Sequence, residues 1–451
     1  MEGLEISVVK LSELNNESRI EAEYFSKENL KLLANLSNYG CIPIFNVANS
    51  VTDGIHTSID YDENSSINLI SAGSPKENVF DLSRSVFISE KAHKENPRTA
   101  LRKNDVVIST VGTIGNCAVV DESILPANSD RHVGIVRLNV EKYSPYVLST
   151  FLLSKYGRMQ TLRESTGNVQ LSLFLYKIRE LLIPNFSDTF QSKIESIVKS
   201  AHAKLEESKS LYSQAEDLLL GELGLKDWQP KNTLHTTKKF SDFAQTGRLD
   251  AEYYQPKYDD LFERLQKVDC KTIKEIQIIN YRGFQPEYVE NGKIDVINSK
   301  HILEDGLDYE NFEKTDEVSF NNAVRAQVKY GDILTYTTGA NIGRTQVYLS
   351  EKKAMASNHV NMLRVKDVNP IYLALVLNSK IGRMQTEKSS TGSAQVELYP
   401  DDLASLIIPI LPEAIQTKIA SLIQQSFECK AQSKQLLEDA KRMVESEIEK
   451  N

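Results

Sequence analysis

Cysteine is scarce in this chain of 451 residues, which contains four: Cys41, Cys117, Cys270 and Cys429. They are scattered, and no two of them form a CxxC pair. Zinc sites and disulfide frameworks need cysteines at characteristic close spacings or in clustered, even sets. We therefore expect reduced thiols in a core or at the surface, and no metal site.

Long apolar runs are also missing, because no stretch reaches the roughly 18 apolar residues of a membrane helix. The chain starts with MEGLEISVVK, which is acidic and amphipathic, whereas a secretory leader is basic and then apolar. With 40% hydrophobic and 25% charged residues, the composition predicts a globular protein that can bury two or more ordinary cores. We expect a cytoplasmic location.

A surplus of positive charge is lacking as well, since 53 Lys and Arg stand against 62 Asp and Glu, a net charge of -9. This balance argues against a protein coated with phosphate-binding lysines. It leaves nucleic acid open, because binding depends on a local basic face rather than on the total charge. It also suggests that a partner supplies part of any phosphate contact.

The signatures of several enzyme classes are absent. GxSxG and GxxxxGK[ST] do not occur, and the segment 295–300 is too loose a match to a nuclease site. NPIY at 369–372 resembles the NPPY signature of amino-methyltransferases. However, its third residue is Ile371, the other half reads SPYV, and no FxGxG loop occurs, so we interpret NPIY as a helix cap. Catalysis by this chain stays a rival hypothesis, and we predict that the chain is not an enzyme.

What the sequence does contain is an internal repeat. RIEAEYFSKEN at 19–29 returns as RLDAEYYQPKY at 248–258, a separation of 248 − 19 = 229. The separation drifts slowly to 225 along these pairs: Arg19 and Arg248, Asp105 and Asp332, Arg137 and Arg364, Gly157 and Gly382, Thr166 and Thr391, Gln170 and Gln395, and Pro184 and Pro409. Such drift is typical of small insertions and deletions in surface loops. The chain is a tandem of two homologous halves, and by this reading no cysteine has a counterpart in the other half.

Each half predicts the same order of elements, opening with short strand-like runs and glycine-rich turns. Alternation predicts half-buried strands at 66–73 and 293–300, and a turn aspartate introduces further strands at 104–110 and 331–337. Glycine loops, VGTIGN and TGANIGR, lead to the strands CAVV and TQVYL, and His132 then matches His359. Helices are predicted from Ser144-Pro145 and Asn369-Pro370. GRMQT, a polar STG loop and the strands LLIP and LIIP follow in both halves.

The tail of each half predicts a long helix with a narrow apolar seam. Most gaps between its members are 3 or 4 residues. The members are Phe190, Ile194, Ile197, Ala201, Leu205, Leu211, Ala215 and Leu218 in the first tail, and Ile415, Ile419, Leu422, Phe427, Leu436, Ala440 and Met443 in the second. We expect the two seams to bury each other; packing of each helix on its own domain is the alternative. An antiparallel pair of roughly 30-residue helices would hold two units about 45 Å apart, and one turn of B-DNA advances about 34 Å.

This order of motifs resembles the DNA-specificity subunit of type I restriction-modification enzymes. The resemblance rests on a series of motifs that recurs in the same order over nearly the whole chain. The histidine segment, GRMQT, STG and the QxxI that starts each helix occur in both halves, and GDI, the GxIG loop and LIIP have close counterparts in the other half. It implies an α+β fold with two homologous mixed α/β target-recognition domains, separated by a pair of long antiparallel coiled-coil helices in a pseudo-two-fold internal repeat. The expected segments are a first target-recognition domain at 1–186, a first conserved spacer helix at 187–224, a linker at 225–238, a second target-recognition domain at 239–411 and a second spacer helix at 412–451.

The resemblance also implies partners and a function. The chain would recognise a bipartite target in double-stranded DNA and dock two methyltransferase subunits, through which restriction subunits join. It would bind no cofactor itself, and S-adenosylmethionine would belong to the methyltransferase subunits. A coiled-coil scaffold that binds only protein, without DNA readout, stays the alternative.

Candidate DNA contacts are polar residues in loops beside glycines or where the halves differ, because base edges and phosphates are read by donors and acceptors. They are Thr110, Thr113, Asn116, Asn128, Arg131 and His132 in the first half, and Arg282, Lys300, Thr338, Asn341, Arg344, Asn358 and His359 in the second. The repeated Arg158, Arg383, Gln170 and Gln395 are expected to hold the fold or a phosphate, since identical residues cannot explain different specificities. Partner-binding helices are expected to contain Ile194, Ile197, Leu205, Leu211, Ile419, Leu422, Leu436 and Met443.

Overall fold

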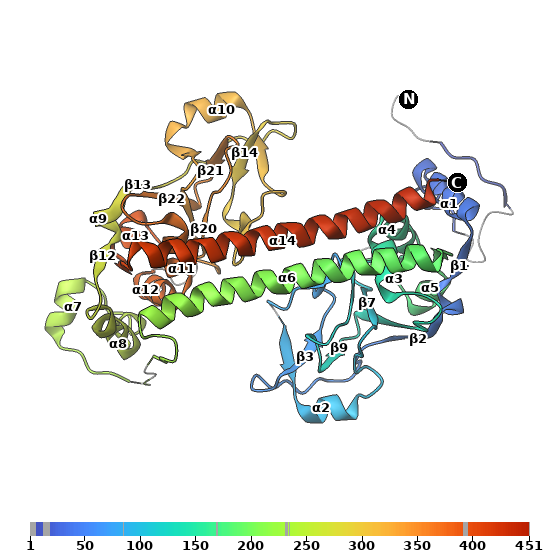
Figure 1. Ribbon diagram of the computed structural model, residues 1–451, viewed down its shortest axis with the longest axis horizontal. Coiled ribbons are helices and arrows are strands. Elements are labelled where there is room, and N and C mark those ends of the chain that lie inside the picture. Colours follow the sequence, from blue (N-terminus) through green and yellow to red (C-terminus); the bar gives the residue numbers. More distant parts are fainter. Residues whose placement is uncertain are drawn as a thin grey trace. The chain divides into compact units, whose positions relative to one another are not determined.

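The computed structural model describes residues 6–11, 19–83, 85–167, 170–230, 233, 235–390 and 396–450 (Figure 1). Two compact units share the chain: residues 1–205 with 430–451 form the first, and residues 206–429 form the second. The repeated positions Thr391 and Gln395 lie outside the described residues. Among the helices within the described ranges, none is long and apolar enough to cross a membrane.

The first unit contains, in chain order, η2 (Glu23–Phe25), α1 (Lys27–Tyr39), β1 (Cys41–Pro43), η3 (Ile44–Asn46), β2 (Ala48–Asp53), β3 (Ile67–Ile70), β4 (Pro75–Lys76), β5 (Val79–Phe80), β6 (Val86–Ile88), α2 (Glu90–Glu95), β7 (Val106–Ser109), β8 (Cys117–Val119), β9 (Ala127–Ser129), β10 (Val133–Leu138), α3 (Pro145–Leu153), α4 (Lys155–Arg163), α5 (Leu175–Glu180) and β11 (Leu182–Pro184). The long helix α6 (Asp188–Glu222) begins in this unit.

The second unit contains α7 (Phe240–Thr246), η4 (Glu252–Tyr254), α8 (Pro256–Leu265), β12 (Cys270–Thr272), α9 (Ile273–Ile276), β13 (Gln277–Arg282), β14 (Ile294–Ile297), η5 (Ser299–His301), β15 (Ile302–Leu303), β16 (Gly306–Leu307), β17 (Glu313–Thr315), α10 (Glu317–Asn322), η6 (Val324–Ala326), β18 (Gln327–Val328), β19 (Ile333–Tyr336), β20 (Thr345–Val347), β21 (Ala354–Ala356), β22 (Val360–Val365), α11 (Pro370–Asn378), α12 (Lys380–Ser389), α13 (Pro400–Ser405) and β23 (Ile407–Pro409). The second long helix, α14 (Glu413–Ile448), begins here.

Sheet topology confirms the internal repeat. The first unit has a four-stranded sheet in the order β2-β10-β7-β8, and the second has β13-β22-β19-β20. A second sheet is β6-β3-β9 in the first unit and β17-β14-β21-β18 in the second, and each contains one parallel pair, β3 with β9 or β14 with β21. Small pairs, β1-β11 and β12-β23, join the start and end of each sheet region.

The predicted strands and the predicted helix starts are present, with corrections. Strand β14 is buried along its whole length rather than on one face, and the ammonium of Lys314 bonds the buried Asp295 carboxylate. Helices precede the first strand of each half, α1 in the first half and α7 and α8 in the second, where the sequence predicts strand-like runs. GRMQT falls inside a further helix, α4 or α12.

The NPIY segment is a helix cap, as predicted. The Oδ1 atom of Asn369 accepts hydrogen bonds from the backbone N–H groups of Ile371 at 2.9 Å and Tyr372 at 3.2 Å. These bonds satisfy donors that the first turn of α11 leaves without an intrahelical partner. Ser144 occupies the same position before α3 but makes no such bond, and its hydroxyl donates instead to Glu195 at 2.7 Å.

The core of each unit lies between its four-stranded sheet and the helices that follow it. All nine residues of α3 are buried, and Phe151 is fully enclosed. Burying one such side chain stabilises a fold by about 1.5–3 kcal/mol. In the second unit α11 occupies the same place, with Tyr372 and Leu373 fully buried.

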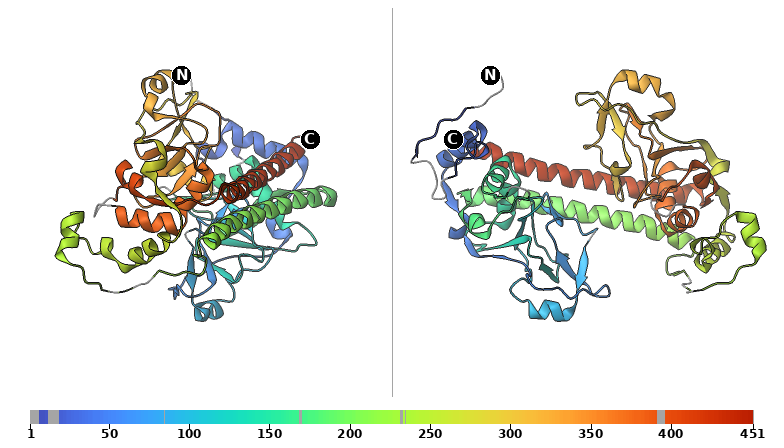
Figure 2. Two further views of the ribbon diagram at one scale, coloured as in Figure 1. Left: turned by 60° about the vertical axis from the view of Figure 1, so that its left-hand side comes forward. Right: turned by 180° about the vertical axis from the view of Figure 1, so that it is seen from behind.

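The long helices α6 and α14 pack together along a seam, as expected (Figures 1 and 2). In the first unit Val198 and Ala201 share one core with Ala440 and Val444, and in the second unit Ala215 and Leu219 share another core with Ile419, Ala420 and Ile423. Early residues of α6 therefore meet late residues of α14, and the two helices are antiparallel. Near the middle, within the second unit, the hydroxyls of Ser208 and Ser426 lie 3.0 Å apart.

The predicted seam is confirmed at Ile194, Ala201, Ala215, Ile419 and Ala440, which are fully buried, and departs from the structure at some positions between them. Val198 and Val444 are fully buried, whereas the predicted seam residues Ile197 and Met443 are only partly buried. The helices therefore meet along a line shifted by one residue at these positions. Because one residue turns an α-helix by about 100°, a seam read from apolar spacing alone is sensitive to which neighbour is chosen.

Two cysteines are equivalent after all, which corrects the sequence reading. Cys41 pairs with Pro184 across β1 and β11, and Cys270 pairs with Pro409 across β12 and β23. Each thiol donates to a carbonyl five residues earlier, that of Leu36 at 3.2 Å or Leu265 at 3.3 Å. Burial raises the pKa of both thiols to about 11, so both stay protonated near neutral pH and are structural.

Candidate DNA interface

The repeated segment near the start of each half, residues 19–29 and 248–258, is hydrogen-bonded to the end of a helix. In the first unit the guanidinium of Arg19 donates to the carbonyl of Arg163, at the end of α4, at 2.8 Å. It also lies 4.6 Å from the centre of the Tyr24 ring, and the guanidinium of Arg163 lies 3.5 Å from that centre. Two cations thus lie against one aromatic ring, which their charge favours.

The second unit repeats this arrangement with a different second cation. Arg248 donates to the carbonyl of Ser389 at 3.1 Å and lies 4.7 Å from the ring centre of Tyr253. The ammonium of Lys388 lies 3.4 Å from the same ring. The segment therefore recurs because each unit uses the same hydrogen bond and cation–aromatic contact to hold it against the helix, and its role is structural.

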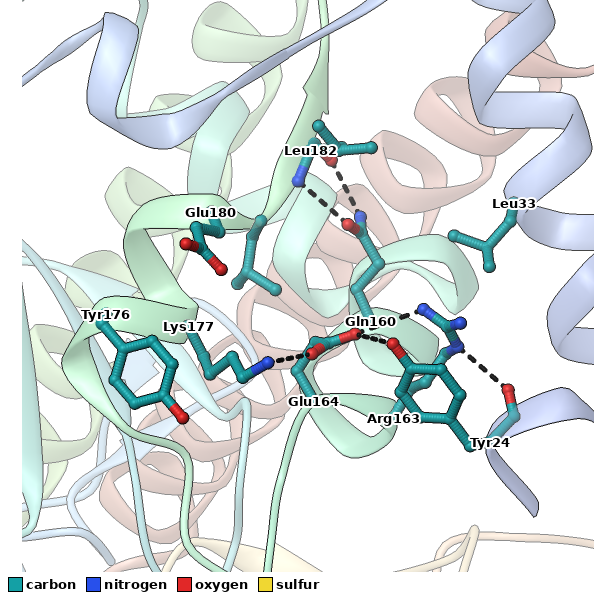
Figure 3. A pocket seen from close by; sticks show the side chains of 10 residues that line it. Tyr24, Leu33, Gln160, Arg163, Glu164, Tyr176, Lys177, Glu180 and Leu182 are labelled. Carbon is teal, nitrogen blue, oxygen red and sulfur yellow. Dashed lines mark hydrogen bonds and ion pairs between the residues drawn. The ribbon is translucent and has the colours of Figure 1, made fainter. Parts of the chain in front are cut away.

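A pocket of about 310 Å³ lies beside this segment in the first unit (Figure 3). Its lining residues are Tyr24, Leu33, Gln160, Arg163, Glu164, Tyr176, Lys177, Glu180, Leu181 and Leu182. Glu164 contacts three other lining side chains. Its carboxylate accepts a hydrogen bond from the Tyr24 hydroxyl at 3.0 Å and forms ion pairs with Lys177 at 3.0 Å and Arg163 at 3.2 Å. Burial raises the pKa of Tyr24 and lowers the pKa of Arg163. These internal pairs fit a role in joining α4 to α5.

The glutamine of GRMQT clamps the last strand in both units. The side-chain amide of Gln160 donates to the carbonyl of Leu182 at 2.8 Å, and its oxygen accepts from the N–H of Leu182 at 2.9 Å. Gln385 makes the same two bonds to Ile407, at 2.9 and 2.8 Å. The identity of GRMQT in the two halves is therefore explained by the fold.

The glutamine that starts each long helix also has one role in both units. Gln191 accepts from the N–H of Ser144 at 2.9 Å and donates to the carbonyl of Phe186 at 3.0 Å. Gln416 accepts from the N–H of Asn369 at 3.0 Å and donates to Leu411 at 2.8 Å. Each long helix is thus hydrogen-bonded to the helix that follows the sheet.

The glycine loops pack against the GRMQT helices. Gly115 and Gly343 both have a φ of +81°, and a Cβ atom on either would lie 2.5 or 2.6 Å from Thr161 or Thr386. Only glycine permits this backbone conformation and this approach at low cost. The loops that carry the candidate residues Thr113, Asn116 and Arg344 are therefore held in place by the repeated framework.

Two candidates of the first unit support the fold. Asn128 is fully buried, and its amide donates to Thr99 at 2.8 Å while its oxygen contacts His93 at 2.5 Å. Thr110 is buried, and its N–H donates to the carbonyl of His132 at 3.0 Å. Asn128 has no polar counterpart in the second unit, where Met355 takes the same register position.

The other candidates of the first unit reach the surface. Arg131 is exposed, and its Nε lies 3.3 Å from the half-buried ring of His132. Asn116 accepts from Arg158 at 2.5 Å, and the exposed Thr113 donates to the carbonyl of Ala72 at 3.1 Å. The structure therefore brings Arg131 and His132 together in one turn and places Thr113 and Asn116 in the glycine loop.

In the second unit, Arg282, Thr338 and His359 come together. His359 is exposed, and its Nδ1 lies 3.3 Å from the Thr338 hydroxyl. Thr338 forms a β-bridge with Glu397, whose carboxylate lies 3.7 Å from the guanidinium of Arg282. Asn358 is exposed beside His359.

The remaining candidates of the second unit lie in other pairs. Arg344 donates to Asn341 and to Glu304, both at 3.1 Å. Lys300 is exposed and pairs with Glu313 at 2.5 Å. These contacts leave DNA binding by all the candidate residues as a prediction.

The repeated Arg158 and Arg383 have different local partners. Arg158 donates to Glu77 at 2.8 Å as well as to Asn116, whereas Arg383 donates to the carbonyl of Asn378 at 3.4 Å. Burial lowers the pKa of Arg383. Gln395, expected to act with them, lies outside the described residues.

The candidate partner-binding residues lie on the long helices but face inward to different degrees. Ile194 and Ile419 are fully buried, and Ile197, Leu205, Leu211, Leu422, Leu436 and Met443 are partly buried. Partner docking on these helices stays a prediction, and it would use their other faces.

A charged position that the sequence reading missed is Asp53. Asp53 pairs with Gly134 across β2 and β10, and Arg282 pairs with Asn361 across β13 and β22, so the two charges are equivalent and opposite. Asp53 holds Arg98 at 3.0 Å and His56 at 2.6 Å. A signal was available, because the glycines that follow, Gly54 and Gly283, are separated by 283 − 54 = 229, as Arg19 and Arg248 are.

Within the described segments no group of three or more His, Cys, Asp or Glu residues could hold a metal ion.

Comparison with known proteins points to one family. Residues 266–442 match the family model described as "Type I restriction modification DNA specificity domain". Among proteins with curated functions, none matches this chain in sequence.

Three solved structures are similar at low scores. The type I restriction-modification S subunit from M. genitalium is 13% identical, with 91% of this chain and 94% of that chain covered and a TM-score of 0.44. The HsdS subunit from Thermoanaerobacter tengcongensis is 14% identical, with 91% and 95% covered and a TM-score of 0.29. The type IIG restriction endonuclease BpuSI is 11% identical, with 41% and 29% covered and a TM-score of 0.30.

The matched segment makes the second half a DNA specificity domain of the restriction-modification class. The first half has the same strand order as the second half, the same glutamine hydrogen bonds to the last strand and the same arginine hydrogen bond to the end of a helix. The family match therefore covers most of the second half, and the first half shares the framework of that half.

Proposed function

We propose that this chain recognises a bipartite target in double-stranded DNA, one block with each unit, and docks two methyltransferase subunits through which restriction subunits join. The chain itself would catalyse nothing and bind no cofactor, with S-adenosylmethionine held by the methyltransferase subunits. It would act in the cytoplasm, where the DNA and these partners are.

One observation carries the proposal: the buried framework is the same in both units while the residues on it differ. Gln160 and Gln385 make the same bonds, but Asp53 occupies the position of Arg282. Two domains that recognise different DNA sequences need different surface donors and acceptors, because base edges are recognised by specific donor and acceptor patterns. They can share one framework.

The paired helices support the bipartite part of the proposal. Helix α6 has 35 residues and α14 has 36, and a straight helix of that size is about 52 Å long. Such a rod suits two DNA blocks separated by a gap of about one helical turn, which advances about 34 Å.

Selection from a random duplex library, with the full chain alone and with a methyltransferase encoded beside it, tests the function. We expect two short conserved blocks at a fixed gap, with tighter binding in the presence of the methyltransferase. Binding to the methyltransferase with no sequence selection would support the protein-only scaffold, and turnover of DNA by the isolated chain would support the enzyme hypothesis.

A further inference from the structure

Arg98 and Arg325 occupy the same place in the two units, although the sequence reading did not match them. Their separation is 325 − 98 = 227. The register around them is fixed by further pairs with the same separation, which are Ser89 and Asp316 at the helix caps, Glu90 and Glu317 at the helix starts, Ala100 and Gln327 on the following strands, and Asn128 and Met355 opposite them.

In the first unit Arg98 lies across the end of strand β2. Its guanidinium donates to the carboxylate of Asp53 at 3.0 Å, to the Asp53 carbonyl at 3.2 Å and to the Gly54 carbonyl at 3.3 Å. The Arg98 side chain is nevertheless 55% exposed. Burial raises the pKa of Asp53, but the bonds from His56 and Arg98 outweigh it and lower that pKa overall.

In the second unit the acidic partner is gone. The position of Asp53 is taken by Arg282, which donates instead to the Leu398 carbonyl at 3.0 Å and lies 4.9 Å from the Tyr399 ring centre. Arg325 lies in η6 and is exposed, and its side chain forms no hydrogen bond or ion pair with another residue of the described ranges. An arginine is thus present at this position in both halves, whereas the aspartate that pairs with it is present only in the first. Pairing with Asp53 therefore does not explain why both halves have an arginine here.

Both arginines neighbour the exposed turn that carries predicted DNA contacts. Thr99, next to Arg98, accepts from the N–H of Ser129 at 3.3 Å, and Arg131 follows two residues later. In the second unit strand β18 starts two residues after Arg325 and pairs with β21, which leads into the turn of Asn358 and His359. Each unit therefore places one guanidinium and one exposed polar turn on neighbouring segments.

We propose that Arg98 and Arg325 are equivalent contacts to backbone phosphates of duplex DNA, one in each unit, and that Asp53 weakens the first of them. This inference rests on the proposed function. An identical residue at an equivalent position cannot distinguish two DNA sequences. A backbone phosphate lies beside every base pair, and a guanidinium binds it regardless of sequence. Asp53 lowers the local positive charge at Arg98, whereas no carboxylate of the described residues forms such an ion pair with Arg325.

The test uses the full chain with its methyltransferase, a duplex carrying the selected target and a scrambled duplex of equal length. Arg98→Gln and Arg325→Gln are each expected to weaken binding to both duplexes by a similar factor, roughly three- to tenfold, and to lower the slope of log K against log salt by about 1. Asp53→Asn is expected to tighten binding to both duplexes.

Matched controls remove a charge nearby without touching the proposed contact. Lys94→Gln acts on α2, where Lys94 pairs with Glu90 at 2.6 Å, and Lys353→Gln removes the partner of Glu317 at 3.0 Å. Both should leave the salt slope unchanged. Melting curves of all variants should stay close to that of the original chain.

The outcomes separate this proposal from the function on which it rests. An unchanged salt slope in Arg98→Gln and Arg325→Gln, or a changed preference at one base pair, would overturn the phosphate contact while leaving target recognition intact. Lost methyltransferase assembly with unchanged DNA binding would assign these arginines to a protein partner instead. If the original chain selects no target at all, the proposed function fails first.

Discussion

Arg364 donates to both carboxylate oxygens of Asp332, at 2.7 and 2.8 Å, and the Asp332 carboxylate is completely buried. Arg137 and Asp105 form the same pair in the first unit, at 3.0 and 3.2 Å. The pair joins a residue of the central strand to the turn before the neighbouring strand, and its presence in both halves indicates that it stabilises the sheet.

Removing one member of this pair should destabilise the second unit. Arg364→Ala leaves a buried carboxylate without its cation, which costs about 3 kcal/mol, and urea denaturation would measure the loss. The matched double variant Asp332→Asn with Arg364→Ala should recover part of the loss, because it removes the unpaired charge. A double variant as unstable as the sum of its single changes would show that the pair is not coupled.

The glutamine clamp predicts a cost of similar size. Gln385→Ala leaves both the N–H and the carbonyl of Ile407 without their partner, and two unsatisfied buried groups cost about 2–4 kcal/mol. Gln385→Glu should also destabilise, because a carboxylate cannot donate to the carbonyl. Gln214→Ala, on the exposed side of α6, is the control and should change stability by less than about 0.5 kcal/mol. Equal losses for Gln214→Ala and Gln385→Ala would contradict this role.

The phase of the helix seam can be tested with neighbouring residues. Val444→Ser removes a fully buried apolar group and buries a hydroxyl, for a loss of about 2–4 kcal/mol, whereas Met443→Ser at the partly buried neighbour should cost less. Chemical denaturation and hydrogen exchange along α14 would measure both. A larger loss for Met443→Ser would restore the seam expected from apolar spacing.

Lys388 gives the second unit a specific pH dependence. Burial lowers the pKa of Lys388 to about 8, from its ordinary value of 10.5. Between these values the unfolded chain binds a proton that the folded chain does not, so this residue makes stability rise as pH rises through that window. Its stabilising contribution is fully present above the unfolded pKa and is lost as pH falls through about 8.

The comparison for this prediction is Lys388→Arg, which keeps the cation beside Tyr253 but does not titrate in this range. Urea midpoints of both proteins at pH 7.5 and at alkaline pH would be compared. The midpoint of the original chain should rise relative to that of the variant. Parallel pH profiles would exclude a lowered pKa at Lys388.

If the long helices set the spacing of the two recognised DNA blocks, shortening the helices should change the gap between the blocks without changing the sequence of either block. Deleting four residues from the middle of α6 and four from the facing part of α14 removes about 6 Å of rod, or about two base pairs. Library selection should then return the same two blocks with a shorter gap. Changed blocks at an unchanged gap would contradict the spacing role.

The order of the elements could be predicted from the sequence because it depends on local chemistry. Pro145 and Pro370 occupy the first turns of helices, and Asn369 caps the second of them. Turn aspartates precede strands, and a nearly constant offset reveals the repeat. Ile197 and Val198 are both apolar, so apolar spacing alone does not show which of them is fully buried in the seam. Packing against α14 decides between them.

The sequence by itself determined the duplication, the mixed α/β class and the long paired helices, since each follows from periodicity or from residues repeated at a fixed distance. Only the tertiary structure decided which polar residues are structural and which are exposed. Asn128 and Arg98 look alike as loop residues, yet Asn128 is enclosed by His93 and Thr99 whereas Arg98 is half exposed. Burial and hydrogen-bond partners come from segments distant in the chain, so no local pattern contains them.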